Sequence, residues 1–134
     1  MVIFPGSRSK NRIWPAEYFA AVATYIRENT ELSIVICGGN ADKIYAFEFT
    51  KVYSGEVLDV TGKTRLPELL TILHRATALI TVDTGSVHLA AAVGCKVFGI
   101  FNGSQYGRFA PYPKELAKNM YSAYPDEILS DLND

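Results

Sequence analysis

The segment from residue 83 to residue 88, Asp-Thr-Gly-Ser-Val-His, carries the side chains best suited to binding a ligand. It follows an apolar run and opens a short apolar stretch that we expect to be a helix. Free N–H groups and the positive dipole at a helix N-terminus favour an anion, which Thr84, Gly85 and Ser86 are placed to bind. Asp83 would repel a phosphate there, so it is better suited to accept hydrogen bonds from ligand hydroxyls. His88, in the first helical turn, is placed to point at the same ligand.

The same segment also has structural interpretations. Asp83 and Thr84 are typical helix-capping residues, worth about 1 kcal/mol, and His88 would serve as a structural histidine. Asp-Thr-Gly after an apolar run is also the signature of aspartic proteases. That function requires an all-β fold with a symmetric pair of carboxylates, whereas the helix-like residues 88–93 follow the motif directly. The protease interpretation is therefore excluded.

A second cluster, residues 6–12, reads Gly-Ser-Arg-Ser-Lys-Asn-Arg and follows the first apolar run. The cations of Arg8, Lys10 and Arg12 and the hydroxyl of Ser7 suit an anion such as a diphosphate. A solvated basic loop is the alternative. If the strands follow the Rossmann order, this cluster and the Asp-Thr-Gly segment face one crevice, which favours a binding site.

Five short apolar runs alternate with helical stretches along the chain. The runs are continuous rather than alternating in polarity, as in strands covered on both faces. This pattern predicts an α/β fold, a Rossmann-like parallel sheet of about five strands with helices on both faces, formed by one domain over residues 1–134. Glycine follows every expected strand, and the carboxyl ends of parallel strands share the edge where ligands bind. The expected strands are 2–4, 32–37, 57–60, 78–82 and 96–101.

Helices are expected where apolar residues recur at helical spacing. Residues 41–53 are ambiguous, because Ile44, Phe47 and Val52 lie only roughly on one face. The clearer helices carry the stripes Phe19, Val22, Ala23 and Ile26 after Pro15, and Leu66, Leu69, Leu70 and Leu73 around Pro67, and a third helix over 87–93 is ended by Gly94.

The C-terminal part of the chain differs in character from the rest. Residues 103–124 are rich in glycine, proline and aromatic side chains and lack helical periodicity, so we expect an irregular segment. Its aromatic residues would pack on the sheet edge or form a surface that meets another domain or subunit. A short helix over 125–132 is expected to close the domain.

The composition excludes several classes of function. The chain has 134 residues, 49% of them hydrophobic, and 13 basic side chains against 14 acidic ones. This balance argues against a general nucleic-acid binder, and no apolar run reaches the ~20 residues of a membrane span. No spacing of His, Cys, Asp and Glu suggests a metal site, and no G-x-G-x-x-G or P-loop motif is present. The two cysteines, Cys37 and Cys95, indicate buried packing in a reducing, cytosolic compartment.

Five short motifs in order resemble glycosyltransferase family 9, the heptosyltransferase family of bacterial lipopolysaccharide synthesis. Together they cover about residues 3–104, most of the chain. Each motif is weak alone, but five in this order are specific. They are Pro-Gly-Ser at 5–7 with Arg-Ile-Trp-Pro at 12–15, Gly-Gly-Asn-Ala-Asp at 38–42, Thr-Gly-Lys-Thr-Arg-Leu at 61–66, Asp-Thr-Gly-Ser-Val-His-Leu-Ala-Ala-Ala at 83–92 and Phe-Asn-Gly-Ser at 101–104.

The resemblance implies the GT-B architecture, in which two Rossmann-like domains enclose a substrate cleft. This chain is similar only to the C-terminal domain, which binds the nucleotide-sugar donor. By the family pattern, Arg12 stands where a lysine contacts the donor phosphates, with Ser7 and Arg8 in the same loop. Thr84 and Gly85 would offer backbone N–H groups to the diphosphate.

The remaining implied roles concern the sugar and the nucleoside. Asp83 and His88 would lie beside the sugar. Asp42 aligns with an acidic residue that binds the ribose, and Thr64 with a residue near the base. The chain departs from the family pattern at three positions, with Arg12 for lysine, Asp42 for glutamate and Asn102 for glycine.

The resemblance further implies an inverting, metal-independent glycosyl transfer that uses no cofactor. The donor would be a nucleotide diphosphate sugar, ADP-linked, and the acceptor a lipopolysaccharide or another glycan. Arg12, Lys10 and the amides of Thr84 and Gly85 would stabilise the charge that develops on the diphosphate leaving group.

In the family, the general base lies in an N-terminal acceptor domain that these residues do not include. Either that domain or a separate acceptor-binding subunit would have to supply the base. We therefore expect this chain alone to bind donor weakly and to transfer sugar very slowly. The resemblance implies a cytoplasmic, bacterial protein at the inner face of the membrane, with peripheral membrane contact through the acceptor domain. Two alternatives stay open: a non-catalytic nucleotide-sugar-binding module or subunit, and one half of a GT-B-type sugar-nucleotide epimerase.

Overall fold

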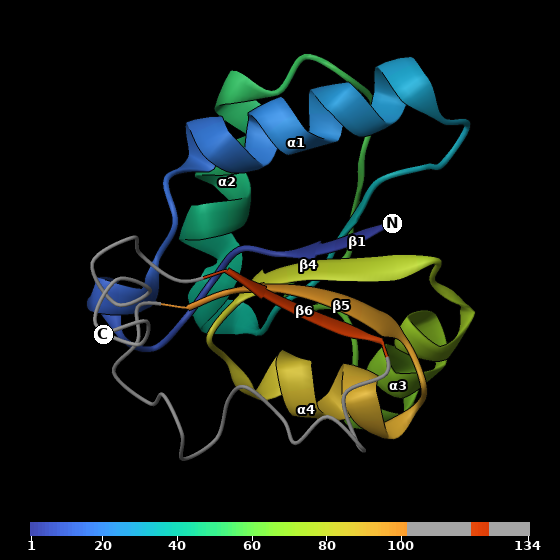
Figure 1. The fold of residues 1–134 in the computed structure, drawn as a ribbon. Helices are drawn as coiled ribbons and strands as arrows, with labels where there is room; N and C mark the ends of the chain where they lie inside the picture. The colour runs from blue at the N-terminus through green and yellow to red at the C-terminus, as the bar shows by residue number, and fades with distance from the viewer. Residues whose placement is uncertain (102–118, 124–134) are drawn as a thin grey trace, which may run out of the picture.

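The computed structural model describes residues 1–101 and 119–123 of the chain. Their strands form one six-stranded parallel sheet in the order β3-β2-β1-β4-β5-β6 (Figure 1). This is the Rossmann strand order, so the predicted Rossmann-like α/β fold is confirmed. The strands are β1 (Val2–Phe4), β2 (Val35–Ile36), β3 (Leu58–Asp59), β4 (Ala78–Val82), β5 (Lys96–Ile100) and β6 (Met120–Ala123).

Strand β1 lies at the centre of the sheet, between β2 and β4. Val2 is opposite Val35 of β2 on one side and Leu79 of β4 on the other. The chain adds β2 and β3 on one side of β1 and then returns to add β4, β5 and β6 on the other. The strand order therefore reverses between β1 and β4, and in parallel α/β sheets ligands bind beyond the carboxyl ends of the strands at this point.

Helices cover both faces of the sheet (Figure 1). Helices α1 and α2 pack on the face that carries Ile3 and Ile80, and α3 and α4 on the face that carries Val2 and Leu79. Successive strand residues point to opposite faces, so β1, β2, β4 and β5 each contribute to both cores. The helices are α1 (Ala16–Asn29), α2 (Lys43–Val52), α3 (Leu66–Arg75) and α4 (Gly85–Ala92), with short 3-10 helices η1 (Lys10–Arg12) and η2 (Asn40–Asp42).

The apolar stripe expected for the first helix is confirmed in α1. Phe19, Ala23 and Ile26 are buried. The ring of Trp14 meets the ring of Phe19 edge-on, with 4.9 Å between their centroids. This contact holds the start of α1 against the core, and so fixes the end of the basic segment 6–12 that precedes it.

Helix α2 forms in the segment whose pattern is ambiguous, and it does not bury the residues that lie roughly on one face there. Ile44 and Phe47 are 59% and 62% exposed, and Val52 is also exposed, whereas Ala46 and Phe49 are buried. The helix carries two apolar faces, so periodicity alone cannot choose between them. The buried face carries Phe49, which packs into the core with α1. The ring of Phe49 stacks on that of Tyr53, with 5.2 Å between the centroids.

Helix α4 begins at Gly85, two residues before the expected start, because Thr84 caps it through a hydrogen bond from the Ser86 N–H to Thr84 Oγ1. It ends at Ala92, and Gly94 follows with a φ of 76°, a left-handed conformation that glycine adopts without steric cost. The expected glycine C-cap is confirmed.

Strand β6 was not expected, because it lies within the segment 103–124 that sequence patterns predict to be irregular. It pairs with β5 in parallel, and the ring of Tyr121 stacks on that of Phe98 at 4.9 Å. Both rings border an apolar groove of about 450 Å³ between β5, β6 and α1. The rest of that segment and the helix expected over 125–132 lie outside the described residues.

Candidate functional site

A cavity of about 470 Å³ opens at the carboxyl edge of the sheet, where β1 and β4 lie side by side. One wall comes from the loop after β1, the other from the loop that joins β4 to α4, and η2 closes a third side. The cavity thus lies at the switch point where the topology places ligand sites. It is lined by Phe4, Gly6, Ser7, Arg8, Arg12, Asp42, Asp83, Thr84, Gly85, Ser86 and Leu89.

The two walls meet through an ion pair. Nε of Arg12, at the end of η1, lies 3.7 Å from Oδ2 of Asp83, which directly follows β4. The two side chains retain 27% and 11% of their exposure, so solvent screens the pair only in part. The pairing offsets the negative charge of Asp83, which alone would disfavour an anion in this cavity.

The N-terminus of α4 belongs to the second wall and forms the floor of the cavity. The first N–H groups of a helix have no partner within the helix. The cap from Thr84 takes up the N–H of Ser86, and the space around Gly85 is open, with no atom within 4 Å of where a Cβ would stand. Gly85 is exposed and lines the cavity, so the positive end of the helix dipole is accessible to an anion there.

Below this floor, three hydroxyl groups join the helix to the sheet. Oγ of Ser86 lies within hydrogen-bond distance of the hydroxyls of Thr81 and Thr84. The Thr81 hydroxyl also lies 3.0 Å from the carbonyl oxygen of Phe4, the last residue of β1. The start of α4 is thus tied to both β4 and β1.

Asp42 stands on the third side of the cavity, at the end of η2. Its Oδ2 accepts a hydrogen bond from the Gly39 N–H at 2.8 Å. The carboxylate also lies directly against Gly6, so closely that a Cβ on residue 6 would overlap it. Glycine at that position lets the loop after β1 approach Asp42, which places the carboxylate beside the basic loop.

Seven of the ten sequence-predicted site residues line the cavity, namely Ser7, Arg8, Arg12, Asp42, Asp83, Thr84 and Gly85. The other three do not. Lys10 is exposed on η1, and His88 is exposed on α4. Thr64 is half-buried in the loop after β3, which reaches the loop after β2 through the hydrogen bond from the Gly62 N–H to the Gly38 carbonyl. For all ten the role in binding stays a prediction.

Sequence reasoning missed the lining residues Phe4 and Leu89 and the buried Thr81 beneath the cavity, whereas Gly6 and Ser86 lie within the two predicted segments. Leu89 and Ser86 belong to the first turns of α4, on the side of the helix that faces the cavity. Helical spacing from Gly85 to Leu89 is the signal that could have found Leu89. Phe4 and Gly6 line the cavity through their place at the end of β1.

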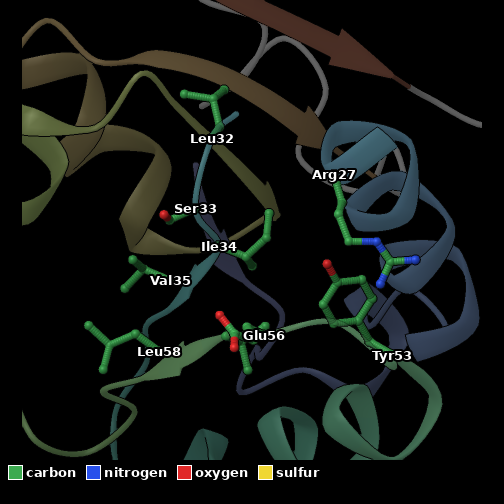
Figure 2. A pocket seen from close by; sticks show the side chains of 9 residues that line it. Arg27, Leu32, Ser33, Ile34, Val35, Tyr53, Glu56 and Leu58 are labelled. Carbon is green, nitrogen blue, oxygen red and sulfur yellow. The ribbon is translucent and has the colours of Figure 1, made fainter. Parts of the chain in front are cut away.

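A second, larger cavity of about 790 Å³ lies at the opposite, amino-terminal edge of the sheet, where β2 and β3 begin (Figure 2). Arg27 and Tyr53 point toward one another there, with the guanidinium 5.3 Å from the ring centroid (Figure 2). Glu56 adds a single carboxylate. This cavity is remote from the switch point and gathers no cluster of cations, so it does not match the predicted anion site.

The described residues outside the cavity contain little other chemistry. Burial raises the pKa of the Cys37 thiol to about 11 and raises that of Cys95 as well, so both are poor nucleophiles. Within residues 1–101 and 119–123, no three or more His, Cys, Asp or Glu residues gather as metal ligands would. None of the helices in that part of the chain combines the length and apolar character needed to cross a bilayer.

Comparison with known families gives a match over nearly the whole chain. The profile of glycosyltransferase family 9 (heptosyltransferase) matches residues 1–128. Lipopolysaccharide heptosyltransferase 3 of Escherichia coli K12 is 27% identical in an alignment of 122 positions that covers 87% of this chain and 34% of that protein. The lipopolysaccharide core heptosyltransferase OpsX of Haemophilus influenzae is 23% identical over 128 residues, 94% of this chain and 36% of that protein. The chain therefore spans about a third of the length of these relatives.

Solved structures share the fold. A glycosyl transferase family 9 protein from Veillonella parvula superposes with a TM-score of 0.83 at 25% identity, covering 99% of this chain and 38% of that one. The E. coli ADP-heptose heptosyltransferase II gives a TM-score of 0.78 at 20% identity, with 98% and 44% covered. The E. coli heptosyltransferase WaaC solved with ADP gives 0.77 at 17% identity, with 98% and 43% covered.

Proposed function

This chain belongs to glycosyltransferase family 9, the heptosyltransferase family, and we propose that it is the donor-binding domain, which holds a nucleotide diphosphate sugar in the cavity between β1 and β4. The observation that carries the proposal is the convergence of two anion-binding elements. The basic loop with Arg8 and Arg12 and the N-terminus of α4 face the same space of about 470 Å³. Two cations and a helix dipole suit the diphosphate of such a donor.

Five of the lining residues have roles that their chemistry supports. Arg12 and Arg8 bind phosphate oxygens by charge-assisted hydrogen bonds, and the Gly85 amide donates to the diphosphate from the other wall. Asp42, on the third side, accepts hydrogen bonds from the ribose hydroxyls. Asp83, held beside Arg12, accepts them from the sugar.

Three further residues complete the proposed site on weaker grounds. Lys10 adds positive charge near the loop, His88 lies on the same helix as the diphosphate amide, and Thr64 lies on the same edge of the sheet as Asp42. None of the three lines the cavity among the described residues. Their contribution to binding is correspondingly expected to be smaller than that of Arg12.

The proposed donor is ADP-linked. Two of the solved structures with this fold are titled as WaaC with ADP and WaaC with ADP-2-deoxy-2-fluoro heptose. They make ADP and ADP-heptose the first ligands to test on this chain. The acceptor we propose is a lipopolysaccharide or another glycan, as the names of the curated relatives suggest.

In the proposed reaction an acceptor hydroxyl displaces the nucleoside diphosphate from the sugar with inversion. Charge then builds on the diphosphate, where Arg12, Arg8 and the N-terminus of α4 would stabilise it without a metal ion. The general base and the acceptor site are assigned to another domain or subunit, since the chain covers about a third of its relatives. We therefore expect this chain alone to bind donor weakly and to transfer sugar very slowly.

Calorimetric titration of the chain tests the proposal. ADP and ADP-heptose are expected to bind with one-to-one stoichiometry, AMP more weakly, and adenosine more weakly still, because the phosphates supply the main contacts. UDP-glucose and GDP-mannose serve as comparison ligands for the choice of base. No heat and no thermal stabilisation with any of these nucleotides would contradict the proposal.

A further inference from the structure

Thr81 places a hydroxyl group inside the core beneath the cavity. It is the fourth residue of β4 and has no exposed surface. It shares its face of the strand with Leu79, which lies in the apolar core beside α4. A hydroxyl in such a position costs free energy unless it is hydrogen-bonded, so its partners explain why it is there.

The partners of Thr81 come from both walls of the cavity. Its Oγ1 lies 3.0 Å from the carbonyl oxygen of Phe4 and 3.1 Å from that of Val82. It also lies 3.0 Å from Oγ of Ser86 and 3.4 Å from Oγ1 of Thr84. A threonine hydroxyl has one proton and two lone pairs. It therefore donates to one carbonyl at a time and can accept a hydrogen bond from Ser86 while it does so.

These contacts connect the two anion-binding elements from below. Phe4 is the last residue of β1, directly before the loop that carries Ser7 and Arg8. Ser86 lies in the first turn of α4, beside Gly85. Thr81 is thus a link between the end of β1 and the start of α4, through a path of three hydroxyl groups.

We propose that Thr81 is a positioning residue for the diphosphate, which fixes the spacing between the loop after β1 and the N-terminus of α4 without touching the ligand. This inference rests on the proposed function, because it assumes that the two elements bind one diphosphate together. When an anion is held from two sides, its binding affinity depends steeply on the distance between the two sets of donors. A shift of the start of α4 away from β1 lengthens the hydrogen bonds on one side, and binding weakens.

The test compares Thr81→Val, which removes the hydroxyl, with Thr81→Ser, which keeps it. Calorimetry of both variants and the parent with ADP and with adenosine gives the affinity for the diphosphate and for the nucleoside. Thr81→Val is expected to weaken ADP binding about three- to tenfold, the worth of one neutral hydrogen bond, and to leave adenosine binding unchanged. Thr81→Ser is expected to bind ADP within about twofold of the parent, a difference well under one hydrogen bond.

Two further variants separate positioning from stability. Leu79→Val lies on the same face of β4 and loses packing without touching the hydroxyls, so it should lower the Tm and leave the affinity for ADP unchanged. Ser86→Ala removes the middle hydroxyl and should weaken ADP binding as Thr81→Val does. Because Ser86 also lines the cavity, Thr81→Ala, which likewise removes the hydroxyl, replaces Thr81→Val in the comparison if that variant does not fold.

The outcomes are distinct. A parent that binds ADP, with loss in Thr81→Val and recovery in Thr81→Ser, supports the positioning role. If the parent binds ADP and both Thr81→Val and Ser86→Ala bind it equally tightly, this inference is overturned and the proposed function stays intact. Equal losses for ADP and adenosine would show a general structural role instead and overturn it too. A parent that binds no ADP contradicts the proposed function itself, and the inference fails with it.

Discussion

Nε of Arg12 and Oδ2 of Asp83 lie 3.7 Å apart, and the two residues belong to the segments that follow two neighbouring central strands, β1 and β4. The pair joins the basic loop after β1 to the loop that opens α4. Through this contact the basic loop and the Asp-Thr-Gly segment form a single site. It also places the Arg12 guanidinium near the N-terminus of α4, where the helix dipole acts. The same pair sets the charge balance of the cavity, with Arg8 as a second cation and Asp42 as a second carboxylate.

Removal of the Arg12 guanidinium is expected to weaken nucleotide binding strongly. A charge-assisted hydrogen bond is worth about 1.5–3 kcal/mol, so Arg12→Ala should lower the affinity for ADP by about 10- to 150-fold in calorimetry. Arg12→Lys keeps the charge and should lose much less. Arg65→Ala is the matched control, since Arg65 is exposed and pairs with Glu68 away from the cavity, and it should bind ADP as the parent does. Parent-like affinity in Arg12→Ala would mean that the phosphate loop is misassigned.

Asp83 is expected to distinguish the sugar nucleotide from the bare nucleotide. Asp83→Asn and Asp83→Ala should reduce the affinity for ADP-heptose several-fold, about 1–2 kcal/mol, because a hydrogen-bond acceptor for the sugar is weakened or lost. ADP itself should bind no worse to Asp83→Asn than to the parent, because a negative charge near the phosphates is gone. The measurement is the ratio of the two dissociation constants. An unchanged ratio in both variants would remove Asp83 from the sugar site.

Gly6 is expected to tolerate no side chain. A Cβ there would overlap the carboxylate of Asp42, so Gly6→Ala should displace Asp42 or the loop and lower stability by about 1–3 kcal/mol. Gly85→Ala is the control, because the space around that position is open and alanine is favourable at a helix start. Thermal unfolding should show a lower Tm only for Gly6→Ala. Equal Tm values for the two variants would mean that Asp42 does not lie against Gly6 in solution.

The Cys37 thiol should make the stability of the fold depend on alkaline pH. Burial and then the nearby carboxylate of Asp59 raise its pKa from 9.0 to about 11. A group whose pKa is higher in the folded state stabilises that state below its unfolded pKa and loses this effect as the pH rises. The difference in unfolding free energy between the parent and Cys37→Ala should therefore be constant up to about pH 9 and narrow toward pH 11. Urea unfolding at several pH values measures it, and a constant difference across that range would contradict the burial of the thiol.

Local patterns predicted the strands that are apolar on both faces and the helices that carry a single apolar stripe. The bounds of β1 and β4 agree with the runs at 2–4 and 78–82, and α1 buries the stripe of Phe19, Ala23 and Ile26. Helix α2 differs because apolar residues occupy two of its faces. Which face is buried depends on α1, a partner that local periodicity does not contain. Strand β6 was not predicted for a related reason, because it is defined by its pairing with β5 rather than by its own composition.

In the candidate site, too, local sequence motifs predicted some residues, while the role of others depends on contacts made only in the folded chain. The residues that line the cavity from Ser7 to Arg12 and from Asp83 to Gly85 were found because their motifs are contiguous and lie at strand ends. The hydroxyl of Thr81 was not, since a threonine within an apolar strand resembles any other β-branched core residue. Its meaning depends on Phe4 and Ser86, which only the folded chain brings to it.

The proposed function depends most on the diphosphate lying between the loop after β1 and the N-terminus of α4. An NMR titration of the isotope-labelled chain with ADP tests this directly, because each backbone amide reports separately. The account predicts the largest shifts at Ser7, Arg8 and Gly85, and small ones at Arg27 and Glu56 beside the cavity on the opposite edge (Figure 2). Shifts that gather around Arg27 and Glu56, or none at saturating ADP, would contradict it.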